Sequence, residues 1–198
     1  MIPLAQLLES LANALTAEQE QEALQHFGAL TDAHLEELTS TRYVKSWPAG
    51  KVLQHLPVGR LVPYVEPLLV HLQDLNWSVT PCVAELLVAM GAPAVPALRR
   101  VFATDPDDGI WMMNLIYNVI QRWEEPLARM LEADLVGYVR YAAREGESIA
   151  ALEALHRLLS AEEHRQLYDF LRGAYEHDAA LLGELWDAFD YEGPRSSD

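Results

Sequence analysis

The chain of 198 residues carries 14 Lys and Arg against 30 Asp and Glu, a formal net charge of −16, and 51% of its residues are apolar. This apolar content is enough for a packed core and excludes a natively disordered chain. The negative charge opposes binding to nucleic acid and to anionic membranes, and it favours basic partners. A single cysteine, Cys82, excludes a disulfide within the chain, and we expect it to be a small buried residue.

The N-terminal segment predicts helices. Leucines at spacing i, i+3, i+4 and i+7 indicate an amphipathic helix over residues 3–14. Thr16 with Gln19 has the pattern of a capping box for a second helix, and a third should end near Leu38. The first residues lack the basic start and continuous apolar core of a signal peptide, and no apolar run reaches the roughly 18 residues that span a bilayer. We therefore expect a cytoplasmic protein.

Residues 38–65 differ from the rest of the chain because they contain no Asp or Glu. Prolines and glycines punctuate this stretch, which predicts a linker followed by short helical pieces. Its cationic and aromatic residues could receive an anion or an acidic partner. The favoured interpretation is that they neutralise acidic helices of the same chain. The secondary candidate binding residues here are Arg42, Lys45, Trp47 and Lys51.

Three proline-led apolar segments repeat along the middle of the chain. They begin at Pro67, Pro96 and Pro126, and further helices are expected over residues 78–90 and 110–122. A spacing of about 30 residues built from helix pairs is typical of an α-solenoid. No segment alternates apolar and polar residues as a strand would. The sequence thus predicts an all-α, right-handed, HEAT-like helical repeat of about ten helices without a sheet.

The expected organisation is one continuous domain in three parts. Residues 1–40 form an N-terminal helical hairpin region, residues 41–135 the repeat core, and residues 136–198 the C-terminal capping helices. In the last part, Ser160 with Glu163 predicts another capping box, and Asp178 can cap the final helix.

A sequence resemblance covers about residues 45–125. Leu72 to Val79 reads LQDLNWSV, and an Asp-Asp-x-x-Trp turn starts at Asp107. These segments resemble the Leu-Gln-Asp-x-Asn-Trp-Pro-Val signature and the later turn of a bacterial family, domain of unknown function 5071. Ser78 stands where that family usually has proline. The resemblance implies a HEAT-like helical-repeat fold and carries no known catalysis.

The two matching turns supply the candidate binding surface. The favoured interpretation is structural: Asp74 and Asn76 end one helix and cap the next, and the two tryptophans wedge between helix pairs. The functional interpretation places all these residues on one surface, because repeats present equivalent turns on one edge. The candidate residues are Asp74, Asn76, Trp77, Asp107, Asp108 and Trp111.

The motifs of known metal and catalytic sites are incomplete in this sequence. Glu153 and His156 form one Glu-x-x-His motif, whereas a di-iron bundle needs two such motifs and two further glutamates. The aspartates of residues 105–109 hint at a calcium loop, but its twelfth position is Ile116 instead of glutamate. Neither a Gly-x-Ser-x-Gly motif nor a glycine-rich phosphate loop occurs. We expect no catalytic residue, no metal site and no cofactor.

The C-terminal helix adds a second pair of candidates. Trp186 and Phe189 lie three residues apart and should share one helix face among acidic residues. The favoured interpretation is a terminal helix that buries Trp186 on the core. The alternative is an acidic-aromatic surface for a basic protein partner, since aromatic side chains anchor many interfaces.

The leading functional hypothesis is a non-enzymatic protein-binding protein. Helical repeats offer extended surfaces, and an immunity-type or inhibitory protein for a basic partner would use the negative charge for fast, steered association. One alternative is an enzyme or small-ligand binder with a site between repeats around Asp74, Asn76 and Asp107. Another is a structural protein that assembles into a homo-oligomer. No nucleic-acid or membrane partner is expected.

Overall fold

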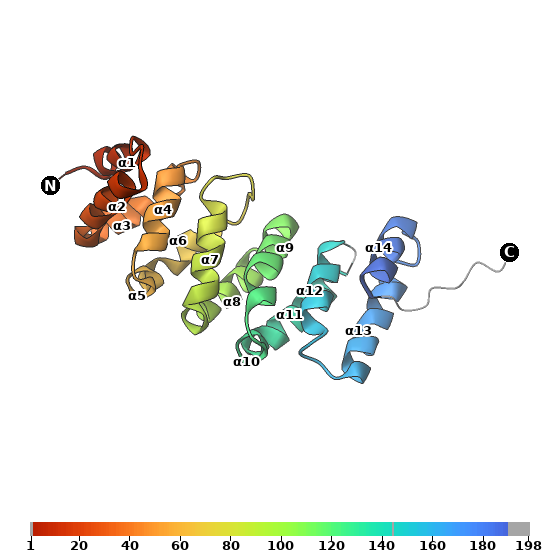
Figure 1. Ribbon diagram of the computed structural model, residues 1–198. Helices are drawn as coiled ribbons and strands as arrows, with labels where there is room; N and C mark the ends of the chain where they lie inside the picture. The colour runs from red at the N-terminus through yellow and green to blue at the C-terminus, as the bar shows by residue number, and fades with distance from the viewer. Residues whose placement is uncertain (1, 144, 190–198) are drawn as a thin grey trace. The chain divides into compact units, whose positions relative to one another are not determined.

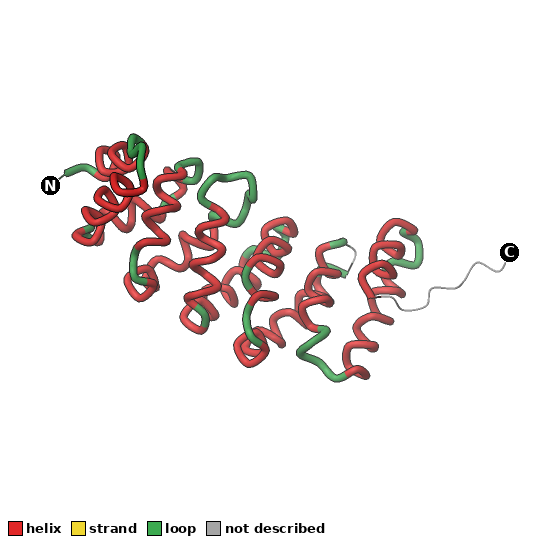
Figure 2. Tube along the Cα trace, viewed as in Figure 1, coloured by secondary structure: helices red, strands yellow, loops and turns green. Residues whose placement is uncertain are grey.

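A computed structural model describes residues 2–143 and 145–189, in which every regular element is a helix and no strand occurs (Figure 2). The α-helices outnumber the roughly ten expected, in part because 3-10 turns divide α5 from α6 and α10 from α11. In these residues no single helix is long and apolar enough to cross a bilayer; α7 and the following segment Ala92–Thr104 meet that criterion only together, as a bent pair. The helices are α1 (Leu4–Ala12), α2 (Ala17–Gln25), α3 (Asp32–Thr39), α4 (Trp47–His55), α5 (Val58–Leu61), α6 (Val65–Val70), α7 (Thr80–Met90), α8 (Val95–Thr104), α9 (Gly109–Asn118), α10 (Glu125–Ala128), α11 (Glu132–Tyr141), α12 (Glu147–Leu155), α13 (Ala161–Ala174) and α14 (Ala179–Phe189).

The chain divides into two compact units. Unit 1 is Met1–Ala97 and unit 2 is Leu98–Asp198, so the boundary falls within α8. Each unit has apolar side chains that are fully buried, such as Leu53 in unit 1 and Leu152 in unit 2. The organisation expected from the sequence, with parts ending at residues 40 and 135, remains a prediction.

The helix caps predicted at Thr16, Ser160 and Asp178 are confirmed, and so are the positions of the repeat prolines near helix starts. Thr16 and Ser160 each form a capping box, at the starts of α2 and α13. The carboxylate of Asp178 accepts hydrogen bonds from the second and third residues of α14 at 3.0 and 3.1 Å. The three repeat prolines lie within the first three positions of α6, α8 and α10, where a missing N–H costs no helical hydrogen bond.

Helix α4 is one of the short helical pieces expected within residues 38–65, and it belongs to the core of unit 1. The helix packs against α1 and α7 (Figure 1), and Val52 and Leu53 are fully buried. The α4–α7 contact is close because Gly50 has no side chain: a Cβ there would lie 2.9 Å from Sγ of Cys82. Cys82 is only half-buried in this contact, less than expected.

Helix α12 is the centre of unit 2, and it contacts α9, α11, α13 and α14 (Figure 1). Leu152 and Leu155 on this helix are fully buried. The turn before α12 is held by the carbonyl oxygen of Glu145, which accepts hydrogen bonds from Tyr175 Oη at 2.8 Å and Ser148 Oγ at 2.9 Å. This network fixes where α12 begins, and therefore where the side chains of its first turn lie.

Two buried histidines are held in their neutral form. His71 is fully buried, and its Nε2–H donates to the carbonyl oxygen of Thr39 at 2.8 Å, so Nδ1 carries no proton and has no hydrogen-bond partner. Burial lowers the pKa of His71 below its ordinary value of 6.5. His164 in unit 2 is also buried: burial lowers its pKa, and its Nε2 lies 3.2 Å from the carbonyl oxygen of Leu152.

These histidines predict a loss of stability in mild acid. A lowered pKa means that the unfolded chain binds the proton more readily than the folded chain, so the full stability is present above about pH 6.5 and falls as the pH drops below it. We expect the free energy of unfolding in urea to decrease between about pH 7 and about pH 5, the range in which histidine changes charge. In His71→Gln, which can still donate to Thr39, this decrease should be smaller. Equal pH dependence of the two proteins would contradict the assignment.

Candidate protein-binding surface

The predicted turn of unit 1 is stabilised by its own side chains. Oδ1 of Asp74 accepts hydrogen bonds from the backbone N–H and from Nδ2 of Asn76, at 2.8 and 2.9 Å. Helix α7 starts after Val79, which provides no side-chain cap. The expectation that Asp74 and Asn76 cap this helix is therefore wrong, because the carboxylate is used within a tight Asx turn. Asn76 is exposed and Trp77 is half-buried.

The same end of unit 1 carries the secondary candidates. The backbone N–H of Val79 donates to the carbonyl oxygen of Val44 at 3.2 Å, which joins the turn to the residues that precede α4. Lys45 and Trp47 are exposed there, and Nζ of Lys51 lies 5.0 Å from the centre of the Trp47 ring. Lys51 also pairs with Glu20 at 3.1 Å, as Arg42 does with Glu37 at 2.7 Å. Both cations therefore offset acids of the chain itself.

The predicted turn of unit 2 has a different structure. Oδ1 of Asp108 accepts a hydrogen bond from the backbone N–H of Trp111 at 3.1 Å and thereby caps α9. Trp111 is 6% exposed, so it packs in the core of unit 2. Asp107 remains exposed, and its Oδ1 accepts a hydrogen bond from Tyr141 Oη at 2.5 Å. The six candidates thus belong to two units, and their placement on one surface remains a prediction.

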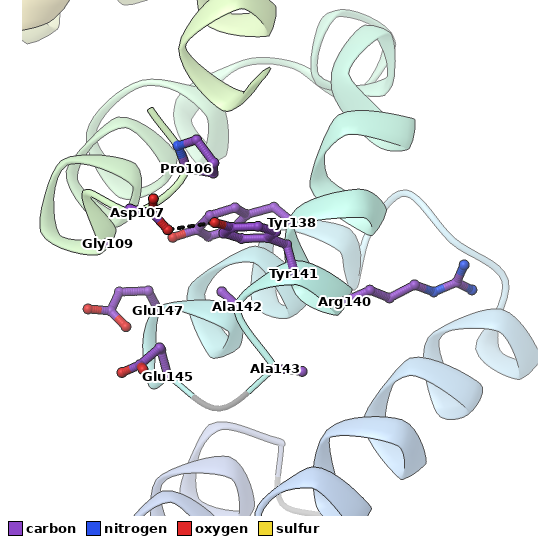
Figure 3. A pocket seen from close by; sticks show the side chains of 10 residues that line it. All are labelled: Pro106, Asp107, Gly109, Tyr138, Arg140, Tyr141, Ala142, Ala143, Glu145 and Glu147. Atoms are coloured by element: carbon purple, nitrogen blue, oxygen red, sulfur yellow. Dashed lines mark hydrogen bonds between the residues drawn. The ribbon is translucent and has the colours of Figure 1, made fainter. Parts of the chain in front are cut away.

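A hollow of about 470 Å³ opens beside Asp107 in unit 2 (Figure 3). We call it the Tyr141 hollow. Asp107 precedes α9, Tyr138 and Tyr141 come from the last turn of α11, and Glu145 and Glu147 come from the start of α12. In Figure 3, the side chain of Arg140 extends away from the three carboxylates. The hollow therefore presents carboxylate and phenol oxygens to an incoming group.

Two further hollows adjoin the Tyr141 hollow at Glu147, which lines all three. One lies over the turn before α9 and includes Ile110, and the other lies between α9, α12 and α14 and includes Tyr117. Among the described residues, Arg140 is the only basic residue that lines any of them, and eight acids line them. We call these three hollows together the acidic groove; its acids are Asp105, Asp107, Asp108, Glu145, Glu147, Glu153, Glu184 and Asp187.

Glu147 reaches the centre of the groove because α9 begins with a glycine. A Cβ on Gly109 would lie 2.6 Å from Oε1 of Glu147, closer than such atoms approach. The carboxylate therefore lies against the N-terminal turn of α9, where the helix dipole favours a negative charge. This contact holds the carboxylate of Glu147 at the surface of the groove.

The pKa values of the tyrosines of the groove are raised, and Tyr117 and Tyr141 donate hydrogen bonds to carboxylates. Burial, followed by the nearby charges of Glu147 and Asp108, raises the pKa of Tyr138 far above its usual value. Burial and the 2.6 Å hydrogen bond to Glu153 raise the pKa of Tyr117 similarly. Tyr141 is 59% exposed and Ile110 60% exposed, so apolar area is available among the acids.

The C-terminal helix contributes its acids to the groove, and its aromatic side chains have other positions. Glu184 and Asp187 line the groove. Phe189 is half-buried and packs against His164, with ring centres 5.2 Å apart. Trp186 is half-buried, and the fully buried residue of α14 is Leu185, so the core contact of this helix differs from the one expected.

The residues of the metal motif have other partners. The carboxylate of Glu153 accepts the hydrogen bond from Tyr117, and the ring of His156 lies 4.9 Å from that of His164, edge to face. Within residues 2–143 and 145–189 no group of three His, Cys, Asp or Glu side chains is arranged to hold a metal ion.

Several residues of the groove were not among the sequence candidates. Glu145, Glu147 and Tyr141 meet Asp107 only because α9, α11 and α12 pack together. The sequence does contain a pattern that indicates them: acidic residues stand at the start of both helices. Asp107 and Asp108 precede α9, and Glu145 and Glu147 stand just before and at the start of α12. Comparison of equivalent turns would have found it.

Comparison with known proteins gave one result. No match was found among curated proteins or among solved structures. Residues 48–157, which are more than half of the chain, match a family described as a domain of unknown function. The match includes α7, α9, α11 and α12, and with them most of the acidic groove. The chain belongs to this family, DUF5071.

Proposed function

We propose that this protein is a non-enzymatic, HEAT-like helical-repeat protein that binds a basic protein partner through the acidic groove of unit 2. The observation that carries the proposal is the junction at Glu147, where three hollows lined by eight acids and exposed apolar side chains adjoin. A groove of one charge concentrates a ligand of the opposite charge and speeds its association. The net charge of −16 acts in the same direction.

The arrangement of helices supports the repeat part of the proposal. In unit 1, α6 packs against α7, and in unit 2, α11 packs against α12. The proline-led segments recur at an interval typical of α-solenoids, which use extended surfaces to bind other proteins. An immunity-type or inhibitory role in the bacterial cytoplasm, against a basic toxin or enzyme, fits a groove of this charge. The two alternatives, a small-ligand site around Asp74, Asn76 and Asp107 and self-association, remain predictions.

Calorimetric titration of the full chain with a basic peptide tests this function. The probe is a blocked nonapeptide in which arginine alternates with alanine, and the control has glutamate in place of arginine. We expect saturable binding of one arginine peptide per chain. The affinity should fall between roughly 0.01 M and roughly 0.15 M salt, as the Debye length shortens from about 30 to about 8 Å. Absence of binding in the lower salt, or several equivalent weak sites per chain, would contradict the proposal.

A further inference from the structure

A glycine in the middle of α11 has no packing reason. Gly137 is the sixth of the ten residues of this helix, and a Cβ built there would meet no atom within 4 Å. Glycine weakens a helix relative to alanine because it has more freedom to lose on folding. Packing within the fold therefore does not explain why glycine stands at this position.

That space is a hollow of about 420 Å³ between α8 and α11, which we call the Gly137 slot. Phe102 and Ala103 line one wall, and Gly137 and Tyr138 line the other. The rings of Phe102 and Tyr138 contact each other edge to face, with their centres 5.6 Å apart, so this part of the wall is fixed. Asp134 also borders the slot, but it pairs with Arg99 at 3.2 Å. The slot is suited to an apolar group.

The slot and the acidic groove share a boundary. Pro106, Tyr138 and Tyr141 line both the Gly137 slot and the Tyr141 hollow. Beyond this boundary lie Asp107 and Glu147. Among the described residues, Arg140 is the basic residue that lines the Tyr141 hollow, and its side chain extends away from these carboxylates (Figure 3). A chain segment that places one side chain in the slot would therefore carry its neighbouring residues over carboxylates.

We propose that the Gly137 slot receives one aliphatic side chain of a basic protein segment, whose adjacent arginine or lysine pairs with Asp107 and Glu147. Charge selects the occupant: a second copy of this chain, with its net charge of −16, would be repelled. The proposal rests on the proposed function and adds to it a recognition element, an aliphatic residue flanked by basic residues. A few side chains packed into pockets carry most of the binding energy of an interface.

The test compares two peptides and two variants. The first peptide is the arginine–alanine nonapeptide, and the second has leucine in place of its central alanine. We expect the full chain to bind the leucine peptide about tenfold more tightly, the factor for roughly two methylene groups removed from water. In Gly137→Leu, which fills the slot, this preference should disappear, so the two peptides should bind with equal affinity.

The second variant, Gly137→Ala, tests the glycine itself. Its melting temperature should rise by roughly 2–4 °C, because alanine favours the helix and meets no neighbour. A lower melting temperature would show that the fold requires glycine there, and the inference would fail. Equal binding of the two peptides by the unaltered chain, or a leucine preference that survives Gly137→Leu, would overturn the slot while leaving the proposed function standing. Binding of neither peptide would remove both.

Discussion

Replacement of Leu152 by alanine is expected to lower the free energy of unfolding by about 2–5 kcal/mol, the usual cost of a large-to-small change in a closed core. Leu152 is fully buried on α12, the helix that contacts α9, α11, α13 and α14. The cavity cannot be filled by movement of one neighbour alone. Urea unfolding followed by circular dichroism measures the loss.

The control for this prediction is Leu15→Ala. Leu15 is 89% exposed, so the same chemical change there should alter the free energy of unfolding by no more than about 0.5 kcal/mol. Similar losses in the two variants would show that α12 does not organise unit 2. Because α12 also begins with Glu147, the Leu152 variant should bind basic peptides less tightly as well.

Removal of three charges from the acidic groove should weaken the binding of the arginine–alanine nonapeptide by about tenfold to a hundredfold in low salt. The variant is Asp107→Asn with Glu145→Gln and Glu147→Gln. Exposed ion pairs contribute up to about 1 kcal/mol each, and a factor of ten in affinity corresponds to about 1.4 kcal/mol. The loss should shrink as salt is added, since screening reduces the interaction of exposed charges. Calorimetric titration in two salt concentrations measures it.

A matched variant separates the groove from the net charge of the protein. Glu9, Glu18 and Glu22 are exposed residues of unit 1, and their replacement by glutamine removes the same three charges. We expect this variant to bind the peptide nearly as tightly as the unaltered chain. If both triple variants lose affinity equally, the binding reflects overall charge, and the groove has no special part in it.

The elements that the sequence predicted correctly depend on local chemistry. Capping boxes at Thr16 and Ser160 and prolines in the first turns need only neighbouring residues, so their patterns are readable along the chain. Short helical pieces were expected where α4 lies, but not its place in the core, because its buried face is partly made of Ala49 and Gly50, which leave little apolar pattern. The cap expected from Asp74 and Asn76 did not form, because Oδ1 of Asp74 accepts hydrogen bonds from the backbone N–H and from Nδ2 of Asn76 within the turn.

The candidate site could be predicted only in part. Asp107 was found because it lies in a recognisable turn. Tyr141 and Glu147 were not found, because their proximity to that turn depends on how α9, α11 and α12 pack, at sequence separations that no local pattern reports. The Gly137 slot could not be predicted because it exists only where α8 and α11 pack beside each other, and the sequence does not report that packing.

Chemical-shift mapping of the full chain, titrated with the leucine-containing arginine nonapeptide, tests the location of the binding surface most directly. Glycine amides are convenient reporters, since they lie in each region of interest. We predict the largest shifts at Gly109, Gly137 and Gly146 and little change at Gly28 and Gly50 of unit 1. Shifts spread evenly over both units, or centred on the turn at Asp74, would contradict binding in the acidic groove.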